Sequence, residues 1–401
     1  TTVSTTMSFF WILVYVLVNL TSVLSLGAIT LEAVLGIPIL YSIVGLAVVS
    51  AIYTIYGGLS AVAWTDFIQV GVLVVGGLAV VWLGLDQIAL KYEASGAADG
   101  WAKLMTVQAD QFHMVLPASH EELPWTGIFL GGLWIAALSY WGCNQYIIQR
   151  ALAAKSLKEA QHGLLFAAML SLIVAVIIVV PGVIARELYA DQIDSRDQAF
   201  PVLIRELLPV GYSGLVIAAL IAAIISSLNS MCNSVATIFT MDVYQKLIAP
   251  QASGERLVTV GRWVTALALL IAIMVTPAIA SMGRLFAFIQ EYTGFVTPGV
   301  VCIFLLGLFW KRMSSKAALW AVILTIPLSV AAKILLSHWA FLDRMTLTFI
   351  LLLLVSVLIS RRQPPVDTPD RAAPLPASTL LYNIGSLLII TLIAAFYIVF
   401  R

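Results

Sequence analysis

Charged residues are scarce in this sequence. Only 10% of its 401 residues are Asp, Glu, Lys or Arg, whereas 61% are hydrophobic. A soluble domain carries about 25% charged residues because its surface faces water. The 21 basic and 20 acidic residues leave a net charge of +1, so there is no basic field for a nucleic-acid partner. This scarcity excludes a water-covered globule and indicates a lipid environment.

Residues that build metal or catalytic sites are also few. The three cysteines, Cys143, Cys232 and Cys302, fall inside apolar stretches. We expect them to be small buried hydrophobic residues rather than a disulfide framework. The four histidines share no metal-ligand spacing, and there is no Walker loop for ATP. We therefore predict that the protein is not an enzyme.

What the sequence does contain is a series of apolar runs of about 20 residues, the length that crosses about 30 Å of hydrocarbon as a helix. Strands of a transmembrane β-barrel would alternate apolar and polar residues, and the runs do not alternate. The fold class predicted is an all-α polytopic membrane protein with about eleven transmembrane helices. These are expected near 9–35, 38–57, 66–90, 125–149, 161–186, 213–240, 258–282, 286–310, 315–338, 343–360 and 380–400.

Polar segments separate the runs at 91–124, at 187–212 and, rich in proline, at 363–376. Lys and Arg accumulate on the cytoplasmic side of membrane proteins. If Thr1 lies inside, the loops on its side carry more of these residues, which places the segment 91–124 outside the cytoplasm. A short amphipathic surface helix is expected around 200–208, and Lys333 is expected to snorkel toward the interface.

Polar residues inside the apolar runs are the remaining candidates for function, because lipid cannot hydrogen-bond them. The richest patch contains Ser226, Ser227, Asn229 and Ser230. Adjacent hydroxyls and backbone carbonyls at a bend can bind a small hard cation. Ser and Thr are also common helix-packing residues that bond the preceding turn. The residues alone leave both interpretations open.

A second feature interrupts the run at 286–310. Gln290 and Glu291 precede Gly294 and the Pro298–Gly299 pair. Such interruptions free backbone groups and are tolerated where they line a cavity. The alternative is a proline kink with Glu291 bonded to a neighbouring helix.

A third feature combines glycines with aromatic residues at 131–150. Tyr140 and Trp141 offer flat faces on which sugar rings stack, although interfacial aromatic belts explain many such residues. Asp66 and Arg150 both lie near the cytoplasmic ends of their runs, where they could form an ion pair.

Several short segments then follow one another in a recognisable order along the chain. They are Tyr56–Asp66, Tyr140–Gly142, Asn144–Arg150, Ala222–Ser227, Thr237–Asp242, Gln290–Tyr292 and Leu306–Trp310. Together they resemble the solute:sodium symporter family, in its sodium/glucose and sodium/galactose cotransporter branch and closest to its bacterial members. The resemblance implies a multi-pass protein of the bacterial inner membrane that uses the Na⁺ gradient to take up a sugar or sugar-like solute by alternating access.

The resemblance also implies a domain organisation. The family has a core of two inverted five-helix repeats, and the predicted helices correspond to all but its first three. Residues 1–90 would then be the last three helices of an incomplete first repeat, and 91–124 an extracytoplasmic loop. Residues 125–310 would be the complete second repeat, and 311–401 three accessory helices.

Position by position, the resemblance implies a sodium site. The carbonyl of Ala223 and the hydroxyls of Ser226 and Ser227 match the family's sodium ligands. Asp66 matches a cytoplasmic aspartate that is linked with sodium release. Na⁺ is therefore the only metal expected.

For the solute, the resemblance implies that Tyr140 stacks on the sugar as inner gate, Gln290 binds a hydroxyl and Phe286 is an outer hydrophobic gate. Two departures concern positions where galactose-type relatives carry a polar residue and a lysine: this chain has Ala137 and Ser171. Each lost polar contact costs about 1–3 kcal/mol. The solute is then another sugar, a polyol or a bulkier molecule. A symporter for an organic acid or amino acid and a non-translocating membrane sensor are the alternatives.

Overall fold

The computed structural model describes residues 2–363 and 378–400, and the side chains of 56–65 are not described. Apart from an isolated bridge between Leu116 and Pro124, the elements of the described part are helices, which confirms the predicted all-α class. In the motif Tyr56–Asp66, the only side chain that the structure describes is therefore that of Asp66. The Pro-rich segment predicted at 363–376 lies outside the described residues except for Gln363.

The helices follow one another along the whole described chain. Their bounds are α1 Thr2–Val14, η1 Tyr15–Leu20, α2 Thr21–Leu35, α3 Ile39–Lys91, α4 Ala97–Val107, η2 Ala109–Phe112, α5 Trp125–Phe129, α6 Gly132–Leu138, η3 Ser139–Cys143, α7 Gln145–Leu152, α8 Leu157–Tyr189, η4 Ala190–Gln192, η5 Arg196–Gln198, α9 Ala199–Leu207, α10 Tyr212–Ile238, η6 Phe239–Ile248, α11 Gly254–Ala280, α12 Leu285–Thr293, α13 Thr297–Phe309, α14 Ser315–Leu335, α15 Phe341–Arg361 and α16 Leu380–Val399.

Within the described residues, nine helical stretches are long and apolar enough to cross a membrane. The bent pair α12–α13 makes a tenth, and the apolar helix Ile39–Ile55 at the start of α3 is shorter than the others. Every run that the sequence predicts to span the membrane is therefore helical in this structure.

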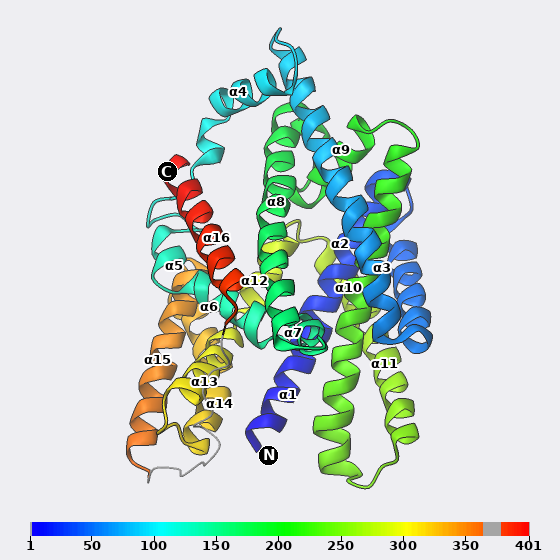
Figure 1. Ribbon diagram of the computed structural model, residues 1–401. Helices are drawn as coiled ribbons and strands as arrows, with labels where there is room; N and C mark the ends of the chain where they lie inside the picture. The colour runs from blue at the N-terminus through cyan, green and yellow to red at the C-terminus, as the bar shows by residue number, and fades with distance from the viewer. Residues whose placement is uncertain (1, 364–377, 401) are drawn as a thin grey trace.

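The 53 residues of α3 are too many for one crossing, since at 1.5 Å per residue they would extend roughly 80 Å. Figure 1 shows the chain turning back within this helix, so that its first and last parts run in different directions. The two parts correspond to the separate predicted runs at 38–57 and 66–90. Asp66 begins the second part.

The largest buried cluster lies where α1, η1 and α2 contact α10 and α11. It includes Tyr15 and Leu24 from the first helices, Leu228 from α10 and Ala272 from α11. The Tyr15 hydroxyl is fully buried and donates a hydrogen bond of 2.6 Å to Asn144 Oδ1, so the polar end of this ring is satisfied. This cluster fixes α10 against its neighbours and thereby positions the polar patch on α10.

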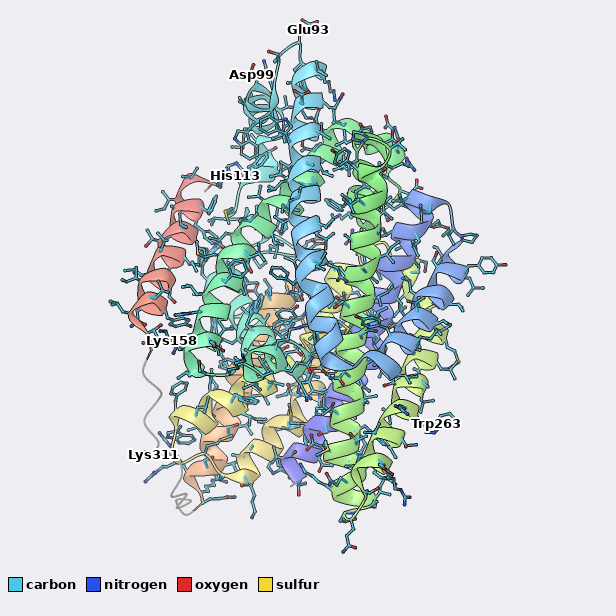
Figure 2. All side chains as sticks on the ribbon, turned by 45° about the vertical axis from the view of Figure 1, so that its right-hand side comes forward. Glu93, Asp99, His113, Lys158, Trp263 and Lys311 are labelled. Carbon is cyan, nitrogen blue, oxygen red and sulfur yellow. The ribbon has the colours of Figure 1, made fainter. Side chains whose placement is uncertain are left out.

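The segment 91–124 forms α4 and η2 at one end of the bundle (Figure 1). It is anchored by Glu187 of α8, whose carboxylate accepts hydrogen bonds from Lys91 Nζ at 2.6 Å, Tyr92 Oη at 2.8 Å and Gln108 Nε2 at 2.7 Å. Figure 2 shows Glu93 and Asp99 at this end and Lys311 toward the other. That distribution agrees with the charge asymmetry from which the orientation is predicted.

The amphipathic helix expected around 200–208 is α9, whose bounds are Ala199–Leu207. Leu203 and Ile204 are buried in a cluster with side chains of α3 and α8, and Val202 is buried as well. The short helix therefore packs by one face onto the long helices.

Candidate functional site

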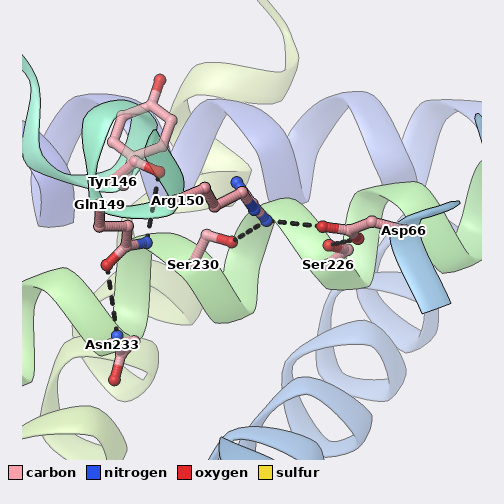
Figure 3. A network of polar contacts seen from close by, with 7 residues as sticks. All are labelled: Asp66, Tyr146, Gln149, Arg150, Ser226, Ser230 and Asn233. Atoms are coloured by element: carbon pink, nitrogen blue, oxygen red, sulfur yellow. Dashed lines mark hydrogen bonds and ion pairs between the residues drawn. The ribbon is translucent and has the colours of Figure 1, made fainter. Parts of the chain in front are cut away.

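The polar patch of α10 meets the start of the second part of α3. Ser226 Oγ donates a hydrogen bond to Asp66 Oδ1, and Arg150 Nη2 of α7 donates to Asp66 Oδ2 at 2.6 Å. The same guanidinium nitrogen donates to Ser230 Oγ at 3.0 Å. Figure 3 shows these four residues in one network, which joins α3, α7 and α10. The predicted pairing of Asp66 with Arg150 is confirmed.

Further polar side chains of α10 make hydrogen bonds of their own. Asn233 Nδ2 donates to Gln149 Oε1 at 3.5 Å (Figure 3). Asn229 Oδ1 accepts from Ser50 Oγ at 2.6 Å and from Thr54 Oγ1 at 2.9 Å, both in the first part of α3. Asn229 Nδ2 is buried and has no hydrogen-bond partner in the described part of the chain. The α10 patch thus bonds both parts of α3.

The three residues predicted as sodium ligands lie on one helix but differ in surroundings. Ser226 is buried, Ala223 is partly buried and Ser227 is exposed. Ala223 and Ser227 are four residues apart and share a face of α10, while Ser226 is turned about 100° from Ser227 toward Asp66. Their oxygens are hydroxyls and a carbonyl, the donors that a hard cation prefers. Among the described residues, no group of three His, Cys, Asp or Glu that could hold a metal ion occurs.

The interrupted run is a pair of helices, α12 and α13, which meet at an angle of 45°. Side chains of α14 satisfy backbone groups at the break. Phe295 O accepts from Thr325 Oγ1 and from Ser329 Oγ, each at 3.2 Å, and Gly299 N donates to Thr325 Oγ1 at 3.1 Å. Neighbouring hydroxyls are what makes a broken helix tolerable inside a membrane.

A cavity of about 790 Å³ lies against α12, within the range of about 300–1,000 Å³ that is usual for small-molecule sites. Phe286, Gln290 and Glu291 all line it. Phe286 and Gln290 are four residues apart and therefore share a face of α12. The interpretation of this segment as cavity-lining is confirmed.

Tyr140 lies apart from the α12 cavity, whose lining includes Leu133 but not Tyr140. Its ring is 41% exposed and makes edge contacts with Trp141 and Tyr146, at centroid distances of 5.3 Å and 6.2 Å. The structure therefore brings Phe286 and Gln290 to one wall and does not bring Tyr140 to it.

The two positions that depart from the galactose-type pattern are both exposed. Ala137 lies three residues before Tyr140 and on the same side of its helical segment. The Ser171 hydroxyl donates to the carbonyl of Ala167 at 2.8 Å, so it is used within α8.

An ion cluster that the sequence did not predict as a group joins α12 to α14 and α15. Glu291 Oε1 accepts from Arg344 Nη2 of α15 at 2.7 Å and lies 3.4 Å from Lys333 Nζ of α14. The alternative that bonded Glu291 to a neighbouring helix is thus also confirmed. Lys333 Nζ also donates to Tyr292 Oη at 3.1 Å and lies 4.4 Å from the centre of that ring, and its snorkelling toward the interface stays a prediction. The sequence did indicate that Glu291 would form an ion pair, since ionisable residues inside apolar runs are expected to pair.

The sequence of this chain is similar to those of known proteins. The model of the sodium:solute symporter family matches residues 1–325. The sodium/glucose cotransporter of Vibrio parahaemolyticus is 42% identical over 99% of this chain and 76% of its own length. The rabbit (Oryctolagus cuniculus) sodium/myo-inositol cotransporter 2 is 34% identical over 83% of this chain and 53% of its own length. This chain therefore spans about half the length of the mammalian relatives that it matches.

A solved structure gives the same architecture. The substrate-bound, outward-open state of a Na⁺-coupled sialic acid symporter superposes with a TM-score of 0.74 at 21% identity, over 91% of this chain and 74% of that one. The likeness shows that the two share a fold, which is built from many membrane-spanning helices. Since the family model covers most of the sequence and the Vibrio relative nearly all of it, this chain belongs to the sodium:solute symporter family.

Proposed function

We propose that the protein is a sodium-coupled symporter that takes up a sugar or sugar-like solute by alternating access. The observation that carries the proposal is the contact of Asp66 with Ser226 inside a bundle of apolar helices. Removing a carboxylate from water costs free energy, and membrane proteins keep such groups mainly where ions or protons move. The driving force would be the Na⁺ gradient.

We place Na⁺ at the carbonyl of Ala223 and the hydroxyls of Ser226 and Ser227. The hydrogen bond from Ser226 to Asp66 supports this placement. It directs the hydroxyl hydrogen toward the carboxylate and leaves the oxygen's lone pairs free for a cation. Asp66, at the cytoplasmic end of its span in the predicted orientation, would receive the ion as it leaves. Ser226 thus belongs to both the binding and the release step.

We place the solute between Gln290 and Tyr140. Gln290 has both an acceptor and donors for sugar hydroxyls, and Phe286 would close the outer side. Tyr140 would close the inner side and stack on the ring when the bundle rocks. Ala137 and Ser171 would make the pocket less polar than in galactose-type relatives. The relatives named for glucose and for myo-inositol support a polyhydroxylated ring as the class of solute.

Coupling follows from linkage between the two sites. If Na⁺ tightens solute binding by some factor, the solute must tighten Na⁺ binding by the same factor. Na⁺ that organises α10 would do this by favouring the outward-open state. Neither ligand needs to touch the other.

The test is uptake by the purified protein in liposomes. With an inward Na⁺ gradient we expect radiolabelled glucose or a related hexose to accumulate, and with an equal K⁺ gradient we expect no accumulation. The absence of Na⁺-driven uptake across a panel of hexoses and polyols would contradict the sugar proposal.

A cyclic polyol is the second candidate solute. The relatives at 34–35% identity named for myo-inositol support it, as does the loss of polar groups at Ala137 and Ser171. Competition decides between the two. If unlabelled myo-inositol displaces labelled glucose at lower concentration than glucose itself does, the polyol is the preferred solute.

A further inference from the structure

The half-helix α12 has unusually little apolar support. Of its nine residues only Leu285 is buried, whereas six residues of α13, Thr297 to Cys302, are buried in succession. The 45° break separates the two helices, so the firm packing of α13 does not extend into α12. An element with few buried apolar contacts opens more easily than its surroundings. The position of α12 therefore depends on contacts other than apolar packing.

Polar contacts supply that support. The Leu285 backbone N–H donates to Asp197 Oδ2 at 3.2 Å at one end of α12, and Thr293 Oγ1 donates to Asn19 Oδ1 at 3.3 Å at the other. Between them stands Glu291, with Arg344 at 2.7 Å and Lys333 at 3.4 Å. The side chains of Glu291 and Arg344 are only 25% and 13% exposed. Partial burial shields this pair from solvent screening, unlike a pair on an open surface.

Glu291 and Gln290 point to different sides of α12. Phe286 and Gln290 share one face of α12, and Glu291, one residue further, is turned about 100° from Gln290. Its carboxylate reaches α14 through Lys333 and α15 through Arg344. Lys333 also donates to the hydroxyl of Tyr292, so two successive residues of α12 are bonded to α14. The cluster thus ties the half-helix to α14 and α15 at the edge of the cavity, which Glu291 and Arg344 also line.

We propose that Glu291 is a positioning residue that fastens α12 to α14 and α15 and so sets the place of Gln290 and Phe286 at the solute cavity. This inference rests on the proposed function for its effect on solute. The apparent dissociation constant rises as the fraction of molecules with α12 in the competent position falls. Weakening the cluster therefore lowers solute affinity through the position of Gln290 and Phe286.

The first experiment measures the position of α12 without any solute. A cysteine placed at Ala287, which lines the cavity, is labelled with a maleimide in the reconstituted protein. The reaction of the native cysteines is subtracted with the protein that lacks Ala287→Cys. We expect Glu291→Gln to raise the labelling rate at least about threefold, because the released half-helix samples open positions. Asp242→Asn, which removes a paired carboxylate from η6, leaves the rate unchanged.

The second experiment measures uptake. Glu291→Gln is expected to raise the half-saturating solute concentration at least about fivefold, with the maximal rate per folded protein within about twofold of the parent. Glu291→Asp, which keeps the carboxylate, recovers part of the loss. Should Glu291→Gln not fold, Lys333→Met serves instead, since it leaves Glu291 paired with Arg344 and is expected to give the same changes at smaller size.

The outcomes separate the two proposals. An unchanged labelling rate in folded Glu291→Gln, or in Lys333→Met where that variant replaces it, overturns the positioning role. So does a loss of maximal rate with no change in half-saturation. If the parent transports no solute at all, the proposed function fails, and the labelling rates still decide whether Glu291 holds α12.

Discussion

Two carboxylates lie inside the helix bundle, and their partners differ in kind. Asp66 is shared between one guanidinium and the hydroxyl of Ser226, which is itself a proposed ligand of Na⁺. Glu291 is held between two cations, Arg344 and Lys333, on helices that carry none of the proposed binding residues. At Asp66 the two carboxylate oxygens have different partners, a hydroxyl at Oδ1 and a guanidinium at Oδ2, whereas both cations contact the same oxygen of Glu291, Oε1. In the proposed mechanism, a partly buried acid serves ion exchange in one region, at Asp66, and fixation in the other, at Glu291.

The largest effect is expected from Asp66→Ala. The substitution leaves Arg150 without its carboxylate and Ser226 without its acceptor, and breaking a buried pair costs about 3–5 kcal/mol, less here because Arg150 is 38% exposed. We expect Na⁺-driven uptake to fall at least about tenfold, measured as the initial rate in liposomes.

A matched control for Asp66 is available at the far end of α3. Glu187→Gln also removes the carboxylate of an ion pair, with Lys91 at 2.6 Å. It is expected to lower thermal stability while leaving the Na⁺ activation curve of the folded protein in place. Equal loss of Na⁺ dependence in both variants would mean that Asp66 has only a structural role, and the contrast with Glu291 would disappear.

The second largest effect is expected from Gln290→Ala. A hydrogen bond to a sugar hydroxyl is worth about 1–1.5 kcal/mol and a left-over unpaired group costs more, so the half-saturating solute concentration should rise about tenfold. The measurement is uptake rate against solute concentration at saturating Na⁺. His338→Ala, which changes another lining residue of the same cavity, should shift it far less. Similar shifts in both would remove Gln290 from the solute site.

These residues show how much of the fold and of the site can be predicted from the sequence. Hydropathy predicts the helical runs because the transfer of side chains into lipid depends on local composition, and a backbone in lipid must satisfy its hydrogen bonds within the segment. The partner of Asp66 was also predictable, since both residues lie at the same depth of their runs. That Glu291 forms an ion pair was predictable too, but its partners Lys333 and Arg344 were not, because tertiary packing sets which helices contact α12. The opposite exposure of Ser226 and Ser227 depends on the rotation of α10, which the sequence of one helix does not determine.

A smaller effect is expected from Ser227→Ala. One neutral oxygen ligand is lost while the buried Ser226 and its bond to Asp66 remain. The Na⁺ concentration for half-maximal uptake should rise about fivefold, roughly 1 kcal/mol, with little change in thermal stability because the side chain is exposed. Ser227→Thr keeps the hydroxyl and should stay near the parent. An unchanged Na⁺ activation curve in Ser227→Ala would take this residue out of the sodium site.

The smallest effect is expected from Ser171→Lys, which tests selectivity for the solute and not Na⁺ binding. Ser171→Lys restores the residue type that galactose-type relatives carry, at an exposed position whose present hydroxyl bonds only its own helix among the contacts described. A new hydrogen bond from a charged donor to a sugar hydroxyl is worth about 1 kcal/mol or more, so galactose should compete about fivefold better against the labelled solute. Ser171→Met adds similar length without the charge and should not help galactose. If the two variants behave alike, Ser171 lies outside the solute path, and selectivity must then be sought at Gln290 on the α12 wall.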